Sequence, residues 1–380
     1  MKNIYSKDFT LGILGGGQLG RMFIQEAVNY DVRVHVLDPA ADAPCAAIAN
    51  KFSVGSFADY DTVYNFGKDK DVLTIEIEHV NVEALKALEK EGVRVFPQPH
   101  VLEIIKDKGL QKSFYRDHQI PTAPFKLVET KAEAIAELKN GPWMQKMRQG
   151  GYDGKGVTPL RNESDTERVF DVPSVLEEMV DFSKEISVIV ARNSKGEIKS
   201  FPVVEMEFNA EANLVEFLFS PAEISKEIEA SAQAIARDVA DKLQIVGILA
   251  VEMFVTKDQQ VLVNEVAPRP HNSGHQTIEG NITSQYEQHL RAICGLPLGN
   301  TDITLPSVMV NLLGEKGYSG PVKYQGIEEV MAHRGVYIHL YGKTETKPFR
   351  KMGHCTVVDE NIKIAKERAR AILKTLKVVS

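Results

Sequence analysis

Short apolar runs alternate with amphipathic helical patterns over the first hundred residues. Such runs have the length and composition of buried strands, and the intervening patterns have the period of helices. Strands that alternate with helices predict a parallel, doubly wound sheet, so we expect an α/β fold here. The strand-like runs cover 9–16, 32–37, 72–77 and 93–96, and the helical patterns cover 19–27 and 82–91.

The pattern changes after about residue 122 to longer strands with fewer helices between them. A helix predicted from about 102 to 118 precedes this change and stops before Pro121 and Pro124. We expect an α+β arrangement in this central part, followed by a strand-rich tail. The expected strands are 125–128, 143–146, 174–178, 185–193, 197–207, 213–219, 247–256, 261–266, 307–313, 336–341 and 354–358, and the expected helices are 131–139, 223–243, 283–295 and 361–376.

The length and composition are those of a soluble globular protein with several domains. A chain of 380 residues is too long for one ordinary core, and 43% hydrophobic and 26% charged residues are typical of globular proteins. The expected division is 1–105, 106–300 with a small subdomain at about 122–180, and 301–380.

Net charge, apolar runs and cysteines indicate the cellular compartment and the kinds of partner that we expect. No apolar run approaches the roughly 20 residues of a membrane span, and the N-terminus lacks a cleavage site, so we expect neither a membrane segment nor a signal peptide. Three distant cysteines favour the reducing cytoplasm. A net charge of −7 argues against a nucleic-acid partner, although the segment 343–351 carries four cations against one acid.

A glycine loop near the N-terminus has the spacing of a dinucleotide-binding turn. Gly15, Gly17 and Gly20 fit the pattern G-x-G-x-x-G after a strand and before a helix, and Asp38 ends the next strand. Such a loop offers backbone N–H groups to an anion. A nicotinamide cofactor, another anion, or a turn that only packs helix on strand all remain open.

Two acids face each other in a predicted hairpin. A turn centred on residues 258–259 pairs Thr256 with Val261, and the same register pairs Glu252 with Glu265. Opposed acids in apolar strands repel each other, and Mg²⁺ would resolve the conflict because it prefers carboxylate oxygens. The alternative is that one acid is protonated or paired with a lysine. Asn264 points to the other face unless the strand bends.

Two further segments carry groups suited to phosphates and reacting oxygens. The loop 150–156 has four glycines in seven residues and Lys155, so its N–H groups could close on phosphates, or it could be an empty hairpin tip. Lys146 lies in an apolar strand, where a lysine needs an anionic partner, whereas Lys112 could equally be solvated. The loop 269–275 presents Arg, two His, Asn and Ser; zinc is a weak alternative there, because a third ligand is missing.

Taken together, the motifs GGGQLGRM, GGYDGKG, AVEMF, NEVAPRPHNSGH and YGKTETKPFRKMGH resemble the ATP-grasp superfamily. More narrowly, they resemble its PurK family over essentially the whole chain. The resemblance implies an N-terminal Rossmann-like domain, a central ATP-grasp domain with a lid and a small C-terminal domain. It also implies a ligase that uses ATP and Mg²⁺ to carboxylate 5-aminoimidazole ribonucleotide with bicarbonate through carboxyphosphate. A homodimer is implied as well.

The resemblance also assigns roles to residues, although His79 stands where the family commonly has asparagine. ATP would meet Lys108, Lys146, Gly151, Tyr152, Asp153, Gly154, Lys155, Gly156, Glu177, Glu178, Met179, Val180, Glu185, Glu205, Asn264 and Glu265. Magnesium would be held by Glu252 and Glu265. The ribonucleotide would meet Gln18, Leu19, Glu76, Ser273, Lys343 and Arg350. Catalytic roles would fall to Arg269, His271, Asn272, His275, Tyr152 and Asp153.

Two alternatives remain at this point. A formate-using glycinamide ribonucleotide transformylase shares the ATP-grasp fold, and the tail YGKTETKPFRKMGH argues against it. A nicotinamide-dependent oxidoreductase built on the glycine loop is the alternative from another class of enzyme.

Overall fold

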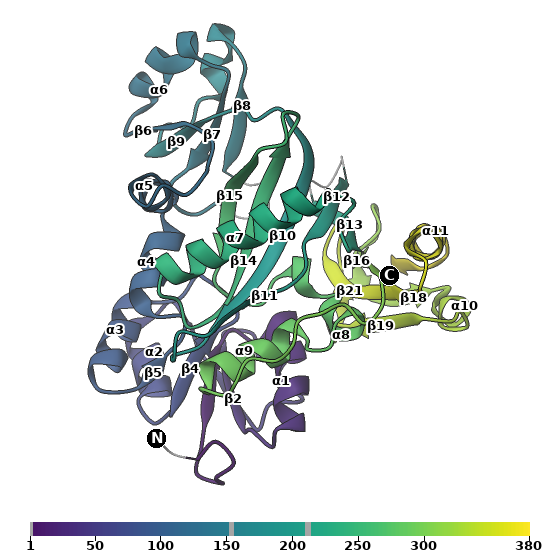
Figure 1. The fold of residues 1–380 in the computed structure, drawn as a ribbon. Coiled ribbons are helices and arrows are strands. Elements are labelled where there is room, and N and C mark those ends of the chain that lie inside the picture. The colour runs from purple at the N-terminus through teal and green to yellow at the C-terminus, as the bar shows by residue number, and fades with distance from the viewer. Residues whose placement is uncertain (1–2, 152–155, 210–213) are drawn as a thin grey trace.

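The computed structural model describes residues 3–151, 156–209 and 214–380 (Figure 1). Its N-terminal part is a five-stranded parallel sheet in the order β3-β2-β1-β4-β5, which confirms the doubly wound fold. The sequence prediction missed β3 and α2. The elements are β1 (Leu11–Leu14), α1 (Gln18–Asn29), β2 (Val34–Asp38), β3 (Lys51–Val54), α2 (Tyr60–Gly67), β4 (Val72–Ile75), α3 (Val82–Lys90), β5 (Arg94–Val95) and α4 (Pro99–Lys106).

Helices from two distant parts of the chain cover the faces of this sheet. On one face, Leu73 and Ile75 join a core that includes residues of α2, α3 and α4. On the other face, α1 packs together with α9 (Gln285–Ile293), so that Ile13 and Leu290 share one core. The N-terminal sheet is thereby fixed to the central part of the chain.

The helix predicted over 102–118 is in fact two helices that meet at Asp107. This residue has φ −114° and ψ 109°, and its carboxylate accepts hydrogen bonds from the N–H groups of Gly109 and Leu110. It therefore caps α5 (Lys108–Asp117) at its N-terminus. Arg148 donates to both carboxylate oxygens of Asp107 at 2.9 Å, which ties this break to the next subdomain.

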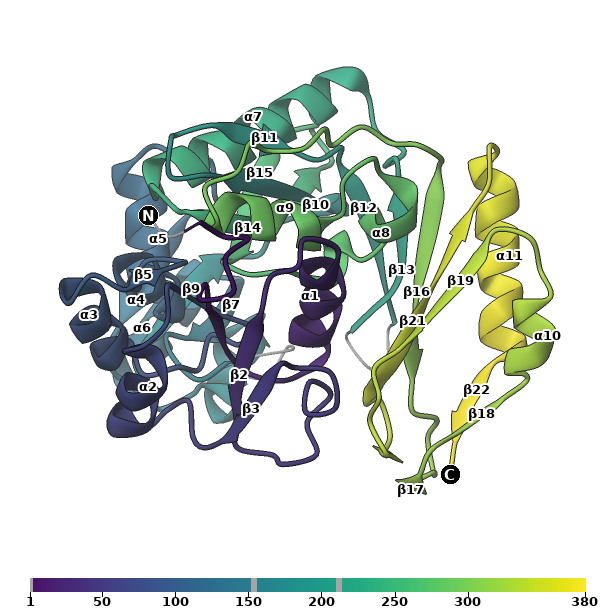
Figure 2. The same ribbon diagram turned by 90° about the horizontal axis from the view of Figure 1, so that it is seen from below.

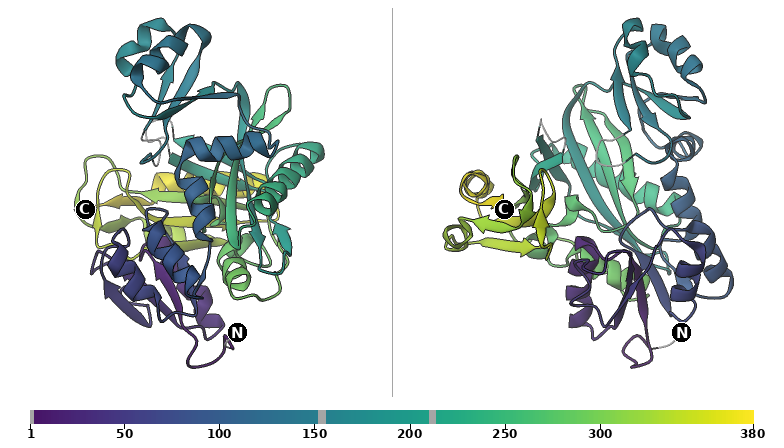
Figure 3. Two further views of the ribbon diagram at one scale, coloured as in Figure 1. Left: turned by 90° about the vertical axis from the view of Figure 1, so that its left-hand side faces the viewer. Right: turned by 180° about the vertical axis from the view of Figure 1, so that it is seen from behind.

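A small four-stranded antiparallel sheet, in the order β6-β9-β7-β8, forms the subdomain that we predict to be the lid, and it projects from the rest of the molecule (Figure 3). Trp143, Leu176 and Ala134 belong to its separate small core. Its elements are β6 (Phe125–Val128), α6 (Lys131–Glu137), the 3-10 helix η1 (Leu138–Asn140), β7 (Trp143–Met147), β8 (Val157–Leu160), the 3-10 helix η2 (Glu163–Arg168) and β9 (Ser174–Glu178).

The central and C-terminal strands form one nine-stranded sheet, with the main path β15-β14-β10-β12-β13-β16-β21-β19 and β11 paired to β10. The tail therefore extends the central sheet, whereas the sequence had suggested a separate group of strands. The long strand expected at 197–207 is split around Pro202. The elements are β10 (Phe182–Arg192), β11 (Ile198–Ser200), β12 (Val204–Asn209), β13 (Leu214–Ser220), α7 (Lys226–Lys242), β14 (Gly247–Thr256), β15 (Val261–Ala267), the 3-10 helix η3 (Asn272–Gly274), α8 (Thr277–Gly280), β16 (Ser307–Leu313), β17 (Gly320–Pro321), β18 (Lys323–Gln325), α10 (Ile327–Met331), β19 (Val336–Leu340), β20 (Glu345–Thr346), β21 (Lys351–Val358), α11 (Ile362–Thr375) and β22 (Lys377–Val379).

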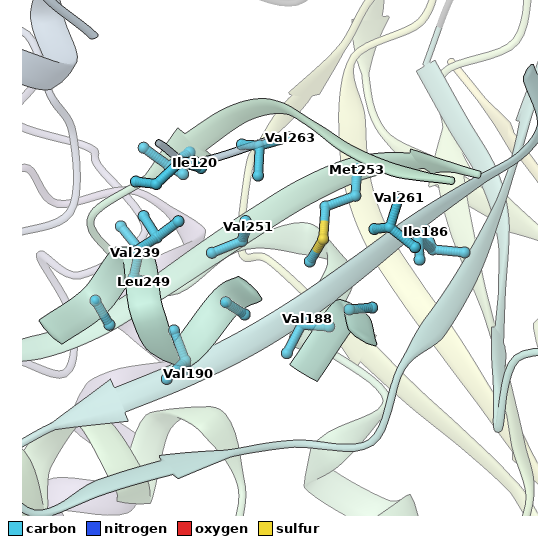
Figure 4. Close-up of a cluster of buried hydrophobic side chains, with 14 of the residues drawn as sticks. Ile120, Ile186, Val188, Val190, Val239, Leu249, Val251, Met253, Val261 and Val263 are labelled. Carbon is cyan, nitrogen blue, oxygen red and sulfur yellow. The ribbon is translucent and has the colours of Figure 1, made fainter. Parts of the chain in front are cut away.

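Helices cover one face of this sheet. The hydroxyl of Ser225 caps α7, whose buried positions Ile228, Ala232, Ala236 and Val239 recur every three or four residues. These residues pack on the strand residues drawn in Figure 4, such as those of β10 and β14. Farther along, α11 packs on β16 and β21 (Figure 2). On the opposite face, α9 packs against one end of β10 and β14. The remainder of that face on β10, β14 and β15, called the open face below, carries polar side chains.

The hairpin β14–β15 is tighter at its turn than the sequence suggested. Val255, and not Thr256, pairs with Val261. Thr256 instead faces Gln260, to whose carbonyl its N–H donates at 2.9 Å. The turn therefore consists of residues 257–259 and not of 257–260. The predicted register is therefore wrong by one residue beside the turn.

Two further expectations concern the chain as a whole. No helix of the described residues is long and apolar enough to cross a membrane. The division near residues 105 and 300 stays a prediction about folding units.

Candidate active site

The two opposed glutamates lie at a β-bulge. Glu252 faces Glu265 as predicted, but the register shifts directly after Glu252, so that Asn264 is an extra residue. Val263 and Val266 both enter the core under α7, although residues three apart in an unbroken strand would point to opposite faces. The bulge therefore turns Asn264 and Glu265 to the same open face.

The charges of this pair are unequal. Nζ of Lys108 lies 2.5 Å from Oε2 of Glu265, and this ammonium lowers the pKa of Glu265. Burial raises the pKa of Glu252, and the neighbouring charge of Glu265 raises it further. The lysine partner of Glu265 and the raised pKa of Glu252 both agree with the alternative to a metal site.

The donor set nevertheless fits magnesium. Among the described residues there is no group of three or more His, Cys, Asp and Glu side chains placed to hold a metal ion. Magnesium is usually held by one or two carboxylates, with phosphates and water as further ligands. Glu252 and Glu265 would supply such a pair, with Glu265 43% exposed at the side chain.

A buried cluster of two lysines and one glutamate joins the lid to the central sheet. Oε2 of Glu177 on β9 lies 3.0 Å from Nζ of Lys112 and 3.1 Å from Nζ of Lys146. Lys146 on β7 also donates to Oδ1 of Asn264 at 2.8 Å. Burial lowers the pKa of Lys112 to about 8. Burial opposes ionisation of Glu177, but the charges of Lys146 and Lys112 hold its pKa below the ordinary value. The cluster carries one excess positive charge, which suits a polyphosphate.

The glycine-rich loop of the lid is described only at its ends. Gly150 and Gly156 have φ of +80° and +75°, a region that other residues rarely adopt. Gly151 is partly exposed. The remaining predicted loop residues, Tyr152, Asp153, Gly154 and Lys155, lie outside the described residues.

His271 points along the open face toward Glu252. Its Nε2 lies 3.5 Å from Oε1 of Glu252. Nδ1 accepts from the backbone N–H of Ser273 at 3.3 Å, so the proton of the neutral ring is on Nε2. Burial, with the charge of Arg269 next, lowers the pKa of His271 to about 3. The ring is therefore a neutral hydrogen-bond donor at physiological pH.

Two other residues of this loop are turned away from the open face. Ser273 is fully buried, and its hydroxyl lies 2.8 Å from that of Ser187 and 2.9 Å from Nδ1 of His271. His275 is 1% exposed, its ring lies tilted against that of His354, and its Nδ1 is 3.1 Å from the hydroxyl of Tyr286. The structure thus places Ser273 and His275 behind His271, where they support the loop.

Arg269 and Asn272 complete the loop. Nε of Arg269 lies 3.1 Å from Oε1 of Glu78, which follows β4 of the N-terminal sheet. Both polar atoms of the Asn272 side-chain amide are buried without a hydrogen-bond partner among the described residues. An unpaired buried amide costs about 1–3 kcal/mol, so a ligand that pairs with it would recover this energy.

The N-terminal glycine loop is filled by the protein's own carboxylates. The N–H of Gly16 donates to Asp38 at 2.7 Å, and the N–H of Gly17 donates to Glu76 at 2.7 Å. Burial raises the pKa of Glu76. A pyrophosphate would meet two acids where a dinucleotide-binding loop offers free N–H groups. This arrangement argues against the nicotinamide alternative.

The basic segment 343–351, called the basic tail below, lies close to the N-terminal glycine loop. Nη1 of Arg21 on α1 would be 3.4 Å from a Cβ at Gly342. Burial lowers the pKa of Lys343 to about 8, with Arg350 the next cause, while the charge of Glu76 opposes the change. Nζ of Lys343 itself donates to the carbonyl of Lys351 at 2.6 Å. At the start of α1, Gln18 is partly exposed and Leu19 is buried.

One predicted ATP residue lies on the wrong face of the sheet. Glu205 is opposite Ile186, which belongs to the core under α7, and it binds Lys184 at 2.6 Å. Glu185, one residue earlier than Ile186, faces the open side, and burial raises its pKa to about 7. We therefore withdraw Glu205 from the set. The remaining predicted residues, Glu178, Met179 and Val180, lie at the end of β9 and in the connection to β10.

Sequence reasoning left Lys112 without a role and missed three other residues that the structure brings to the site. Lys112 follows Lys108 by four residues, and this spacing on one helix face was a usable signal. The others are joined to the site only by long-range contacts, and no local pattern marks them. They are Glu78, Ser187 and Gln285.

Comparison with known proteins decides the family. The chain matches models of the ribonucleotide synthetase preATP-grasp domain (residues 9–106), the ATP-grasp domain (113–286) and the phosphoribosylaminoimidazole carboxylase C-terminal domain (307–368). The N5-carboxyaminoimidazole ribonucleotide synthase of Bacillus subtilis is 39% identical over 368 residues, which cover 94% of each chain. The chain belongs to the N5-carboxyaminoimidazole ribonucleotide synthase family. It is therefore an ATP-dependent ligase with the ATP-grasp fold, as predicted.

Solved structures of this synthase family have the same fold throughout. The synthetase from Thermotoga maritima is 45% identical, with a TM-score of 0.91 over 98% of this chain and 99% of that one. The synthase from Aspergillus clavatus, in complex with ADP and 5-aminoimidazole ribonucleotide, is 33% identical, with a TM-score of 0.88 over 96% and 98%. Membership of the synthase family removes the nicotinamide alternative.

Proposed function

We propose that this chain carboxylates 5-aminoimidazole ribonucleotide with bicarbonate and ATP, forming 5-(carboxyamino)imidazole ribonucleotide, ADP and phosphate in purine biosynthesis. The observation that carries the site assignment is the single open face on which the Glu252–Glu265 pair, the positive Lys112–Lys146–Glu177 cluster and His271 meet. A phosphate-binding region and a neutral hydrogen-bond donor are thereby side by side.

The phosphorylation of bicarbonate explains why the phosphate-binding region must lie beside His271. Bicarbonate is a poor electrophile, because hydroxide would have to leave, whereas carboxyphosphate releases phosphate. Lys108 and Lys146 would bind the phosphates of ATP, and Glu252 and Glu265 would hold magnesium. Bound magnesium neutralises charge on the phosphates during transfer. Glu177 and the connection through Val180 would meet the adenine, and Glu185 the ribose.

The loop that follows β15 would orient the bicarbonate-derived group and the attacking amine. Arg269 would pair with the negative charge of the bicarbonate-derived group. The side-chain amide of Asn272, which lacks a partner among the described residues, would form hydrogen bonds to the same group. His271 would donate from Nε2 to an oxygen. With a pKa of about 3, His271 carries no second proton at neutral pH, so we assign it orientation and not acid catalysis. Tyr152 and Asp153 of the lid loop would cover the site and exclude water.

The ribonucleotide would lie between the N-terminal glycine loop and the basic tail. Lys343 and Arg350 would bind its 5′-phosphate, and Gln18, Leu19 and Glu76 would line the remainder of its site. The approach of Arg21 on α1 to Gly342, the residue before Lys343, supports a common site from two distant segments. We also propose a cytoplasmic homodimer with small-molecule substrates and no nucleic-acid partner.

An ADP-release assay tests the reaction. With ATP and magnesium present, we expect ADP formation to require 5-aminoimidazole ribonucleotide and bicarbonate together. Formate with glycinamide ribonucleotide is the matched substrate pair for the alternative ATP-grasp ligase. Turnover with that pair, and none with bicarbonate and aminoimidazole ribonucleotide, would overturn the proposal.

The pKa of Lys343 predicts how ribonucleotide binding depends on pH. Its ammonium, which binds phosphate, is present below about pH 8 and is lost above it. We expect the KM for the ribonucleotide to be flat near pH 7 and to rise above pH 8 by up to about tenfold per unit. The Lys343→Arg variant keeps its charge and should flatten this rise. A parallel rise in the KM for ATP, or an unchanged profile in Lys343→Arg, would contradict a phosphate site at Lys343.

A further inference from the structure

The side chain of Gln285 holds the backbone of His271. This glutamine is the first residue of α9 and is fully buried. Its Oε1 accepts from the N–H of His271 at 2.9 Å, and its Nε2 donates to the carbonyl of His271 at 2.8 Å. One carboxamide therefore satisfies both backbone groups of His271, as a neighbouring strand would do.

The rest of the loop closes around the same carboxamide. Nε2 of Gln285 lies 3.1 Å from Nδ1 of His275, and the N–H of Gln285 donates to Oγ1 of Thr277 at 2.8 Å. A Cβ at Gly274 would come within 2.4 Å of Oε1 of Gln285, so the chain passes directly against the amide. Gln285 thus contacts the loop at several points between His271 and Thr277.

The helix that carries Gln285 is itself rigidly placed. Ser284 caps α9 by accepting from the N–H of Glu287. Tyr286 and Leu290 are buried in the core that α9 shares with α1 and the N-terminal sheet. Through Gln285, the position of His271 on the open face is set by a packed helix and not by the loop alone.

We propose that Gln285 is a positioning residue for the carboxylation reaction, which fixes His271 toward Glu252. The inference rests on the proposed role of the His271 loop. Reacting groups that are displaced by about 1 Å can lose about a hundredfold in rate. Loss of the carboxamide should therefore reduce catalysis at the bicarbonate side while leaving the separate ATP contacts in place.

A matched control lies one turn along the same helix. Gln288 is also fully buried, and its Nε2 donates to the carbonyl of Gly299 at 3.1 Å. Its Oε1 accepts from the N–H of Gly299 at 2.7 Å. Gln285 and Gln288 thus make the same pair of backbone hydrogen bonds, but Gly299 carries no side chain and lies outside the predicted site.

The experiment compares Gln285→Met with Gln288→Met. We expect both variants to lose a similar amount of thermal stability, measured as Tm. Only Gln285→Met should lower kcat by tenfold or more and raise the KM for bicarbonate, with the KM for ATP unchanged. Gln288→Met should stay within twofold of the parent in all three constants. Equal kinetics of the two variants would overturn the role of Gln285.

Two further variants keep the test decisive. Gly274→Ala displaces the carboxamide without removing it, and should reproduce the kinetic split if Gln285→Met does not fold. His271→Ala tests the role of the loop separately. Full activity of His271→Ala would refute that role, whereas an inactive His271→Ala beside a fully active Gln285→Met would refute the positioning role alone.

Discussion

Replacing Glu265 by glutamine is expected to reduce ADP formation by at least about 10²–10³-fold, the size of effect found when one charge-stabilising group is removed from an active site. The two side chains have the same shape, so the hairpin and its bulge should persist. What is lost is the negative charge that faces Glu252 and pairs with Lys108 at 2.5 Å. Without it, the site would retain one carboxylate for magnesium, and Lys108 would lose its counter-charge.

The measurement is ADP release as a function of magnesium concentration. We expect Glu265→Gln to need more magnesium for half-maximal activity, in addition to its lower maximum. Glu207→Gln is the matched control, because Glu207 is an exposed acid on β12. Unchanged turnover of Glu265→Gln at limiting magnesium would refute the ligand role of Glu265.

The Glu177→Gln variant is expected to be less stable by about 3–5 kcal/mol, the cost of breaking a buried ion pair on one side. The carboxylate of Glu177 is 5% exposed and neutralises part of the charge of Lys112 and Lys146. Its removal leaves two buried ammonium groups with an amide between them. Because this cluster joins α5, the lid and β15, we also expect the KM for ATP to rise.

Urea unfolding followed by circular dichroism measures the stability. The matched control is Glu178→Gln, the next residue on the same strand, whose side chain is exposed. Glu178→Gln should unfold within about 0.5 kcal/mol of the parent, as is usual for surface substitutions. Equal unfolding midpoints of the two variants would show that the buried cluster contributes no net stability.

The hairpin shows both the strength and the limit of sequence reasoning. The pairing of Glu252 with Glu265 was predicted correctly, but two local errors cancelled to give it. The turn is one residue tighter than assumed, and the extra residue at Asn264 restores the register. A bulge of this kind has no strong local signal, because it depends on which residues the facing core requires.

Local patterns predicted four of the five strands of the N-terminal sheet and most of the helices, but they gave no sign of the long-range contacts. The charged and polar residues of Lys108–Asp117 looked like a continuation of the preceding helix, until the capping carboxylate of Asp107 broke it. The face on which Glu205 lies depends on its pairing with β10. Nothing near Gln285 in the sequence indicates that it supports a loop fourteen residues earlier.

The continuous sheet has a consequence for any attempt to divide the chain. β13 is paired on one side with β12 and on the other with β16, and its residues Phe217 and Phe219 are covered by the same core that includes α11. A fragment that ended near residue 300 would leave β13 as an open apolar edge, and such edges pair with other molecules. We therefore expect that the C-terminal segment does not detach as an independent unit, and that a fragment ending near residue 300 self-associates.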